Sequence, residues 1–328
     1  MVDLEIKPLV SIIITSFNRA KWIGNTIQSA LDQDYPNVEI IISDNQSTDN
    51  SDTVIKKYIH EKRIKYFVND SNIGMMANFK KATEELAKGE YITYVSSDDY
   101  FVNKKFISDS INKMLEYSNV NAVCAKVLLL NQKNNKIIES NFYKCCKNIF
   151  YKKNYVSGIE VFLKFPSKHS VCFGGYLFKR RDLNKIISFN NCIFGDTLII
   201  LQLLCLGDIA FIKDDTYVFR QHENNTYNKN LTGDYFIDNL DFIIIPYNFA
   251  LNNCNIKKEK IENWKEKMLF QFIRYGYIVL GRSKKEEFIK LNKYIESNFP
   301  KTHKKIRGDI RYNLHKNYEN VKMRLKIF

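Results

Sequence analysis

The stretch VSIIIT, residues 10–15, decides the fold class. It is an almost unbroken run of apolar, mostly β-branched side chains, which is typical of a strand buried on both faces. Such strands occur in parallel sheets, where the connections between strands are helices that cover both faces. A helical repeat of apolar residues follows between Ile23 and Leu31, so the sequence predicts a strand followed by a helix.

The same alternation continues through the first 95 residues. Further strands are predicted at 38–43, 64–68 and 91–95, with helical patterns between them near 54–59 and 79–86. This order favours an α/β fold with a mostly parallel central sheet. The first domain is predicted to end near residue 225, and a helical, basic C-terminal region is predicted for residues 226–328.

Beyond residue 103 the alternation weakens. The predicted elements are a helix at 106–117, a hairpin at 122–140, a helix at 151–165, a strand at 170–179 interrupted by Gly174-Gly175, a helix at 197–206, and two short strands at 210–212 and 216–220.

The net charge of +14 is concentrated in the last third of the chain. Residues 226–328 hold 21 Lys and Arg against 11 Asp and Glu, a net +10. Such an excess indicates an anionic partner: a phosphorylated substrate, a lipid surface or nucleic acid. No helix-turn-helix, zinc or RNA-binding signature accompanies it, so nucleic acid is not expected as a partner.

The chain carries no signal of export or membrane insertion. No apolar run reaches the about 20 residues of a membrane span, and the first residues have acids where a signal peptide has basic ones. Seven cysteines without a C-x-x-C pattern argue against a disulfide framework. We therefore expect a cytoplasmic protein. Residues 301–328 hold nine Lys and Arg and two acids, which predicts either peripheral attachment to an anionic inner leaflet or a solvated helical face.

Polar residues follow each of the first four predicted strands. They are residues 15–19, Asp44-Asn45, Asn69-Asp70 and 96–99. In open α/β sheets, ligands bind beyond the carboxyl ends of the strands. The four strand ends therefore predict a polar cleft at one edge of the sheet.

Asp98 and Asp99 form an adjacent acidic pair at the fourth strand end. The chain has no glycine-rich phosphate loop of either common kind. A divalent cation held by the two carboxylates would relieve their repulsion and could bind a diphosphate. The alternative is a solvated loop, or an N-cap pair before the next helix.

Several motifs in order resemble those of family 2 glycosyltransferases. They are VSIIITSFNR at 10–19, SDNQSTDNS at 43–51, the segment 72–101 ending in SSDDYF, FGDTLIILQLLCLGDIAFI at 194–212, and TYVFRQHENN at 216–225. The resemblance covers roughly residues 8 to 225 and implies a GT-A fold. It divides that domain into a nucleotide-sugar half, 1–102, and an acceptor half, 103–225.

The resemblance implies a donor site in the first half. Thr15, Phe17 and Arg19 would bind the nucleotide, and Asp44 would hydrogen-bond the base, as in relatives that use UDP-sugars. Asp98 would lie near the ribose or the metal, and Asp99 would be the principal ligand of Mn²⁺ or Mg²⁺.

The second half would supply the catalytic base and further donor contacts. The resemblance implies that Asp196 is the general base, that Arg220 contacts the diphosphate, and that His222 also does so or binds the metal. The alternative for Asp196 is a helix N-cap. His169 and Gly174-Gly175 either line the acceptor pocket or form a strand bulge.

Two positions depart from the family pattern. Ser96 stands where many members have the first acid of Asp-x-Asp-Asp, and Gly195 stands where many have Glu before the catalytic Asp. The second change leaves Asp196 as the one carboxylate at the position of the family's catalytic pair.

The predicted function is metal-dependent, inverting transfer of a sugar from a nucleotide diphosphate sugar, most simply a UDP-sugar, to a hydroxyl of a glycan or lipid-linked acceptor. The process would be the assembly of a bacterial surface polysaccharide, lipooligosaccharide or other glycan. The alternatives are a nucleotidyltransferase-like enzyme and a nucleic-acid-binding protein. The first would carry a glycine-rich basic loop after the first strand, and TSFNRAKW has no glycine.

Overall fold

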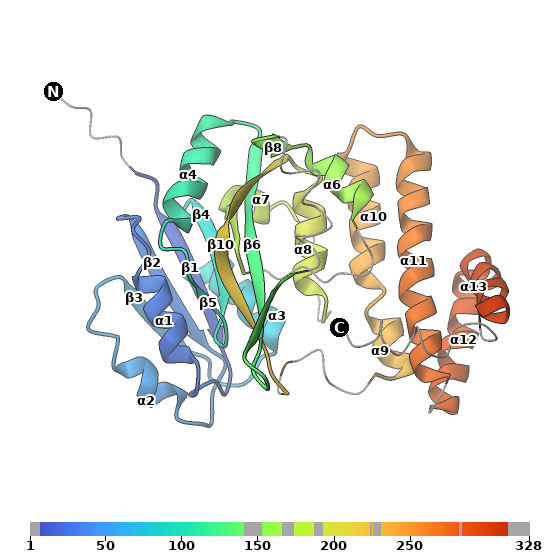
Figure 1. Cartoon of the computed structure of the whole chain (residues 1–328), viewed down its shortest axis with the longest axis horizontal. Coiled ribbons are helices and arrows are strands. Elements are labelled where there is room, and N and C mark those ends of the chain that lie inside the picture. Colours follow the sequence, from blue (N-terminus) through green and yellow to red (C-terminus); the bar gives the residue numbers. More distant parts are fainter. Residues whose placement is uncertain are drawn as a thin grey trace.

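The computed structural model describes residues 7–140, 153–165, 174–186, 193–223, 225, 231–281 and 284–313, with side chains as far as Asp309. A ten-stranded mixed sheet forms its centre, with strand order β3-β2-β1-β4-β9-β6-β10-β5 and with β7 and β8 paired at its side (Figure 1). The long ladders β3-β2-β1-β4 and β6-β10 are parallel, and β9 runs antiparallel between them. The predicted α/β fold with a largely parallel sheet is confirmed.

The strands are β1 (Val10–Ser16), β2 (Val38–Asp44), β3 (Ile64–Val68), β4 (Tyr91–Ser96), β5 (Tyr100–Phe101), β6 (Val120–Asn131), β7 (Lys136–Glu139), β8 (Tyr155–Val156), β9 (Tyr176–Lys179) and β10 (Asp208–Gln221). The helices before residue 225 are α1 (Ile23–Leu31), α2 (Ser51–Lys56), α3 (Met75–Lys81) continued by a π-helical turn (Ala82–Leu86), α4 (Phe106–Glu116), α6 (Gly158–Lys164), α7 (Arg180–Leu183) and α8 (Gly195–Leu203). Those after it are α9 (Gly233–Asp238), α10 (Asp241–Asn253), α11 (Lys258–Leu280), α12 (Lys285–Asn298) and α13 (Pro300–Asn313).

The strand β1 shows why VSIIIT decides the fold. Side chains alternate across a strand, so Ile12 and Ile14 enter one core with α1, α2 and α4, while Ile13 enters the other with α3 and α8. All three side chains are fully buried. A strand with apolar side chains on both faces is stable only when helices cover both, and this chain supplies them.

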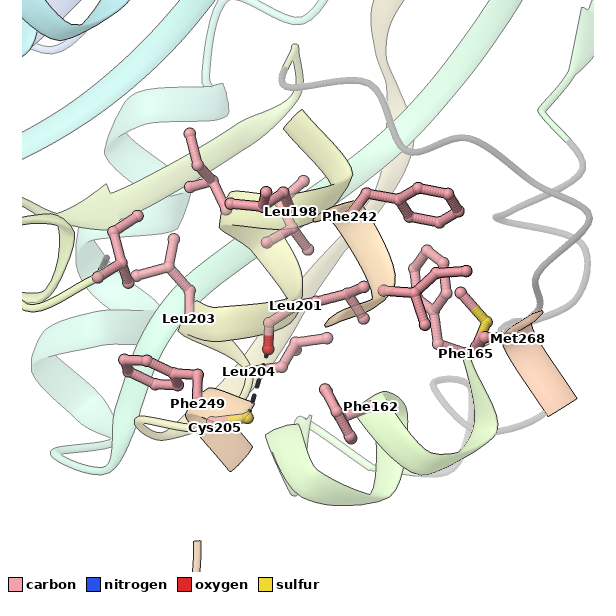
Figure 2. Close-up of a cluster of buried hydrophobic side chains, with 14 of the residues drawn as sticks. Phe162, Phe165, Leu198, Leu201, Leu203, Leu204, Cys205, Phe242, Phe249 and Met268 are labelled. Atoms are coloured by element: carbon pink, nitrogen blue, oxygen red, sulfur yellow. Dashed lines mark hydrogen bonds between the residues drawn. The ribbon is translucent and has the colours of Figure 1, made fainter. Parts of the chain in front are cut away.

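The helix α8 lies between the sheet and the C-terminal helices. Its side chains are buried around its whole circumference apart from the partly exposed Asp196, which is typical of a helix enclosed by protein. Figure 2 shows this cluster, in which leucines of α8 pack among Phe162 of α6, Phe165, and Phe242 and Phe249 of α10.

The C-terminal helices share this core. Trp264 of α11, Ile295 of α12 and Ile306 of α13 belong to the same continuous cluster of buried side chains as Ile13 of the sheet. In Figure 1, α10 and α11 stand beyond α8, and α12 and α13 lie farthest from the sheet. The predicted helical region is therefore present, although its boundary at residue 225 stays a prediction. In the described segments no helix combines the length and apolar character needed to cross a bilayer.

Two of the weaker predictions need correction. The pair of short strands at 210–212 and 216–220 is one strand, β10, because the polar residues 213–215 form an irregularity in its pairing with β6 rather than a loop. Within the described part of the predicted helix, residues 153–165, only residues 158–164 are helical, since residues 155–156 pair with β10 as β8. The hairpin is confirmed as β6 and β7.

Candidate active site

The carboxyl ends of β1, β2 and β4 meet at one edge of the sheet. The parallel register pairs Ser16 with Asp44 and Thr15 with Ser96. Residues that are widely separated in sequence are therefore neighbours there, as the order of polar strand ends predicted. Among the predicted donor residues, Thr15 and Asp44 lie in the last positions of β1 and β2, while Phe17, Arg19 and Asp98 lie on the loops after β1 and β4.

The loops after β1 and β2 are bonded to each other. Asn18, with a positive φ of 53°, accepts a hydrogen bond from the Thr48 backbone N–H at 2.7 Å through Oδ1. The Ala20 N–H donates to Asp49 at 3.0 Å. An asparagine tolerates this left-handed backbone better than most residues. The two loops thus form one wall, on which Phe17 is exposed.

Asp44, the last residue of β2, has one carboxylate oxygen bonded to the loop that follows and one that is buried. Its Oδ1 accepts from the Ser47 N–H at 2.6 Å, whereas within the described segments its buried Oδ2 has no hydrogen-bond partner, and neither has the neighbouring Ser16 hydroxyl. Burial raises the pKa of Asp44 against the hydrogen bonds from Ser47. Buried polar atoms normally have partners, so this oxygen is suited to accept from a bound ligand.

A network of buried amides holds the strand on either side of Asp44. Asn78 of α3 accepts from the Ser43 hydroxyl at 2.7 Å and donates to the Ser43 carbonyl at 3.0 Å. Asn69 donates to Asn78 at 2.9 Å and to Asn45 at 3.1 Å. Both neighbours of Asp44 are therefore fixed to other strands or to α3.

Asp98 and His222 meet at the centre of the edge. The His222 Nε2 lies 3.0 Å from Asp98 Oδ2, and the Arg19 Nε donates to the same oxygen at 3.0 Å. Burial raises the pKa of Asp98, but the hydrogen bond from His222 and the charge of Arg19 outweigh it and leave the pKa below its usual value. The His222 ring also stacks on Trp22 at 4.3 Å. The structure thus brings together three predicted residues and one, Trp22, that was not predicted.

Asp99 faces the strand β10 instead. Its Oδ2 accepts from the Tyr217 hydroxyl and its Oδ1 from the Arg220 backbone N–H, both at 2.8 Å. Burial, followed by the charge of Asp98, raises its pKa well above the usual value. The carboxylate is buried and both its oxygens already accept hydrogen bonds, which favours Asp98 over Asp99 as a metal ligand. The role of Asp99 as the principal ligand stays a prediction.

The Arg220 side chain lies against α1 and β5. It donates to Asn25 at 2.5 Å, and its guanidinium is 4.5 Å from the centre of the Tyr100 ring. The predicted contact of Arg220 with the diphosphate stays a prediction. In this structure the backbone N–H of Arg220 donates to Asp99 and so joins the residue to the acidic pair.

Asp196 lies in the first turn of α8, partly exposed at the start of an otherwise buried helix. Its Oδ1 accepts from the Thr197 N–H at 2.7 Å. Burial is the main cause that raises its pKa to about 7. A carboxylate with a pKa near the working pH can accept a proton efficiently from a hydroxyl.

Gly195 makes room for α3 beside this carboxylate. A Cβ at Gly195 would lie 2.4 Å from the end of the Met76 side chain. Met76 therefore fills the space that a larger residue would take at this position. Because Asn78 of the same short helix bonds Ser43, α3 links the start of α8 to the strand end that carries Asp44.

Gly174 and Gly175 have a structural role beside Tyr217, and their place in an acceptor pocket stays a prediction. A Cβ at Gly174 would lie 1.8 Å from the Tyr217 ring, and Gly175 has a φ of +80° and packs near Val127. The pair therefore lets β9 begin tightly against Tyr217. His169 lies outside the described residues.

Sequence reasoning missed Trp22, Thr26 and Tyr217. The Thr26 hydroxyl donates to the backbone carbonyl of Asp99 at 2.6 Å, and Tyr217 and Trp22 hold Asp99 and His222. Nothing in the sequence separates these residues from ordinary core positions. Among the described residues, no group of three or more His, Cys, Asp or Glu is arranged to hold a metal ion.

Comparisons with known proteins identify the family. The model of glycosyl transferase family 2 matches residues 11–187, more than half of the chain. The Escherichia coli protein named UDP-Glc:alpha-D-GlcNAc-diphosphoundecaprenol beta-1,3-glucosyltransferase WfaP is 43% identical over 106 residues, which span 32% of this chain and 41% of that protein. This chain thus aligns with less than half of that relative's length.

Two solved structures show the same fold at low identity. The structure of S. aureus TarS 1-349 in complex with UDP-GlcNAc has a TM-score of 0.69 at 18% identity, covering 90% of this chain and 82% of that one. The mannosyltransferase PcManGT from Pyrobaculum calidifontis, in complex with GDP-Man and Mn²⁺, has a TM-score of 0.52 at 14% identity, covering 95% and 89%. The predicted GT-A fold is confirmed. With the family match over more than half of its length, the chain belongs to glycosyl transferase family 2.

Proposed function

We propose that this protein transfers a sugar from a UDP-sugar to a hydroxyl of a glycan or lipid-linked acceptor, with inversion, in the assembly of a bacterial surface polysaccharide. The observation that carries the proposal is the meeting of Asp44, Asp98 and His222 at one sheet edge. Similar proteins also support a UDP-sugar as the donor. WfaP is named for UDP-Glc and a diphosphoundecaprenol-linked acceptor, and TarS was solved with UDP-GlcNAc.

A divalent cation fits the site that Asp98 and His222 form. The pair offers one carboxylate and one imidazole, which Mn²⁺ accepts, and Mg²⁺ prefers oxygen ligands such as carboxylate and diphosphate. When bound, the cation would stabilise the negative charge that develops on the departing diphosphate. Arg19, which donates to Asp98 at 3.0 Å, keeps that carboxylate ionised and oriented. PcManGT, with Mn²⁺ in its structure, supports the same expectation.

Asp196 acts on the acceptor in this proposal. Its carboxylate takes the proton of the attacking hydroxyl as the hydroxyl oxygen bonds to the anomeric carbon and the diphosphate leaves. A pKa of about 7 leaves it largely ionised at slightly alkaline pH while it remains basic enough for the task. Thr197, which donates to Oδ1, fixes its direction.

Replacing Asp44 tests whether this residue recognises the uracil base of the donor nucleotide. Uracil has a ring N–H that can donate to Oδ2, whereas cytosine has an acceptor at that position. We expect UDP to bind Asp44→Asn about 10–100-fold more weakly than wild type, the value of a hydrogen bond to a charged group. We expect CDP to lose much less affinity. Isothermal titration calorimetry with both nucleotides and Mn²⁺ measures this.

The control for Asp44 is Asp52→Asn. Asp52 lies nearby on α2, where it pairs with Lys56 near the surface. Its replacement should leave the ratio of UDP to CDP affinity unchanged. Equal affinity of the wild type for UDP and CDP would contradict the assignment of Asp44 to the base.

The basic C-terminal helices support a cytoplasmic location at an anionic membrane surface. Lys301, Lys304 and Lys305 of α13 are exposed. At about 1 kcal/mol each near anionic lipid, replacing all three with Gln should weaken binding to phosphatidylglycerol vesicles about 100-fold in a flotation assay. The same change at Lys257, Lys258 and Lys260, at the start of α11, is the matched control. Truncation is unsuitable, because these helices share the core. Equal flotation of the α13 variant and the wild type would refute the idea.

A further inference from the structure

Asp99 bonds the turn after β4 to the end of β10. The turn carries Asp98, and β10 leads into His222 two residues after Arg220. The carboxylate of Asp99 accepts from Tyr217 on one oxygen and from the Arg220 N–H on the other, each at 2.8 Å. The residue is 1% exposed, so these bonds are shielded from water.

The backbone joins these two segments through the short strand β5 and, on the side away from His222, through bonds from the Val102 and Asn103 N–H groups to the Thr216 carbonyl at 2.8 and 3.4 Å. β5 pairs with β10 at two positions, Tyr100 with Val218 and Phe101 with Tyr217. The bond from the Arg220 N–H to the Asp99 side chain continues that attachment toward His222. On its other side, the turn is held by the Thr26 hydroxyl of α1, which donates to the carbonyls of Ser97 at 3.1 Å and Asp99 at 2.6 Å.

Tyr217 is central to this arrangement. Besides donating to Asp99, its hydroxyl accepts from the Ser96 N–H at 3.3 Å. Its ring is fully buried and lies against Gly174, where no side chain could be added without displacing the ring. The hydroxyl is therefore fixed by the packing of the ring, and it fixes the start of the acidic turn.

We propose that Asp99 and Tyr217 are positioning residues, which set the spacing of Asp98 and His222 and so the affinity of the site for a metal ion with its diphosphate. The inference rests on the proposed function of Asp98 and His222. Two ligands from separate segments bind a cation tightly only if both segments are ordered beforehand. Residues that orient metal ligands typically change metal affinity 10–100-fold when replaced.

The test compares two hydroxyl deletions. Tyr217→Phe removes the bonds to Asp99 and Ser96 and leaves the ring in place. Tyr94→Phe is the matched control: Tyr94 is equally buried, its hydroxyl bonds Thr83 at 2.8 Å, and its ring belongs to the core on the opposite face of the sheet. The affinity for Mn²⁺ in the presence of UDP is measured by electron paramagnetic resonance of the free ion, and stability by thermal unfolding.

We expect Tyr217→Phe to bind Mn²⁺ at least 10-fold more weakly than wild type and Tyr94→Phe to stay within about twofold. Both should lose thermal stability. Unchanged Mn²⁺ affinity in Tyr217→Phe would overturn the positioning role. If that variant does not fold, Asp99→Asn decides the matter by the same readout. Absence of Mn²⁺ binding by the wild type itself would instead overturn the metal role on which the inference rests.

Discussion

Replacing Asp196 with Asn is expected to lower kcat by about 10²–10⁴-fold, the usual contribution of a general base. Asparagine keeps the shape of the side chain and can still accept from the Thr197 N–H. It cannot take the proton of an acceptor hydroxyl. Donor affinity should remain within a few-fold of wild type, since Asp44, Asp98 and His222 are untouched. Normal turnover by Asp196→Asn would rule out this base.

The pH profile gives an independent view of the same residue. The base is active when ionised, so kcat of the wild type should rise with pH through about 7 and level off above it. Asp196→Asn should show a low rate without this rise. A wild-type profile that is flat between pH 6 and 8 would contradict a base with a pKa near 7.

The contribution of Asp196 to folding stability should fall as pH rises, whereas kcat should increase. The folded-state pKa of Asp196 is about 7 against an ordinary value of 3.8, so between these values the folded state holds a proton that the unfolded state has released. Stability from this group is therefore lost as pH rises through that window. Asp196→Asn should melt higher than wild type at pH 8, and the difference should vanish near pH 4.

A matched control for Asp196 exists in α4. Asp109 also lies in the first turn of a helix and also has a pKa raised by burial, but it packs on the opposite face of the sheet. Asp109→Asn should leave kcat and its pH profile unchanged. A similar loss in both variants would show that the effect of Asp196→Asn is general destabilisation.

Replacing Asp98 with Asn is the second large expected effect. It should abolish measurable stimulation by Mn²⁺ and lower kcat/KM by about 10²–10³-fold, because a Lewis acid at a leaving phosphate is worth several kcal/mol. The variant removes one of the two proposed metal ligands and leaves Arg19 without the charge it pairs with at 3.0 Å. Activity with and without EDTA measures the effect.

The control for Asp98 is Asp182→Asn. Asp182 of α7 is also buried and pairs with Lys185 at 2.9 Å. That helix follows Lys179, which pairs with the first residue of β4 and so lies at the edge opposite the site. Asp182→Asn should lose stability while keeping its response to Mn²⁺. Retained stimulation by Mn²⁺ in Asp98→Asn would return the principal role to another residue, such as Asp99.

Much of the fold could be predicted because several of its strands have a recognisable local sequence pattern. VSIIIT and the residues at 38–43 and 91–95 are apolar runs of strand length, and parallel strands require helices between them. The single strand β10 could not be predicted, because Lys213, Asp214 and Asp215 have the composition of a loop. Only the pairing of β10 with β6 on both sides of that irregularity makes it one strand.

The sequence was sufficient to predict which acidic residues gather at the candidate site, but not which partners each of them contacts. Strand ends placed Asp44, Asp98 and Asp99 at one edge, since parallel strands end together. The roles of the two carboxylates depend on partners distant in sequence. Asp99 is bonded to Tyr217 and Arg220, and Asp98 to His222, all at least 118 residues away, and Asp98 is also bonded to Arg19, 79 residues away. No local pattern carries that information.

The most direct test of the account is release of UDP from UDP-sugars by the wild type, with Mn²⁺ and with excess EDTA. A panel of UDP-glucose, UDP-galactose and UDP-N-acetylglucosamine, with GDP-mannose for comparison, covers common donors. The account predicts that at least one UDP-sugar is cleaved with Mn²⁺, that EDTA stops the reaction, and that Asp196→Asn and Asp98→Asn both fail. Full activity in EDTA, or cleavage of GDP-mannose alone, would contradict it.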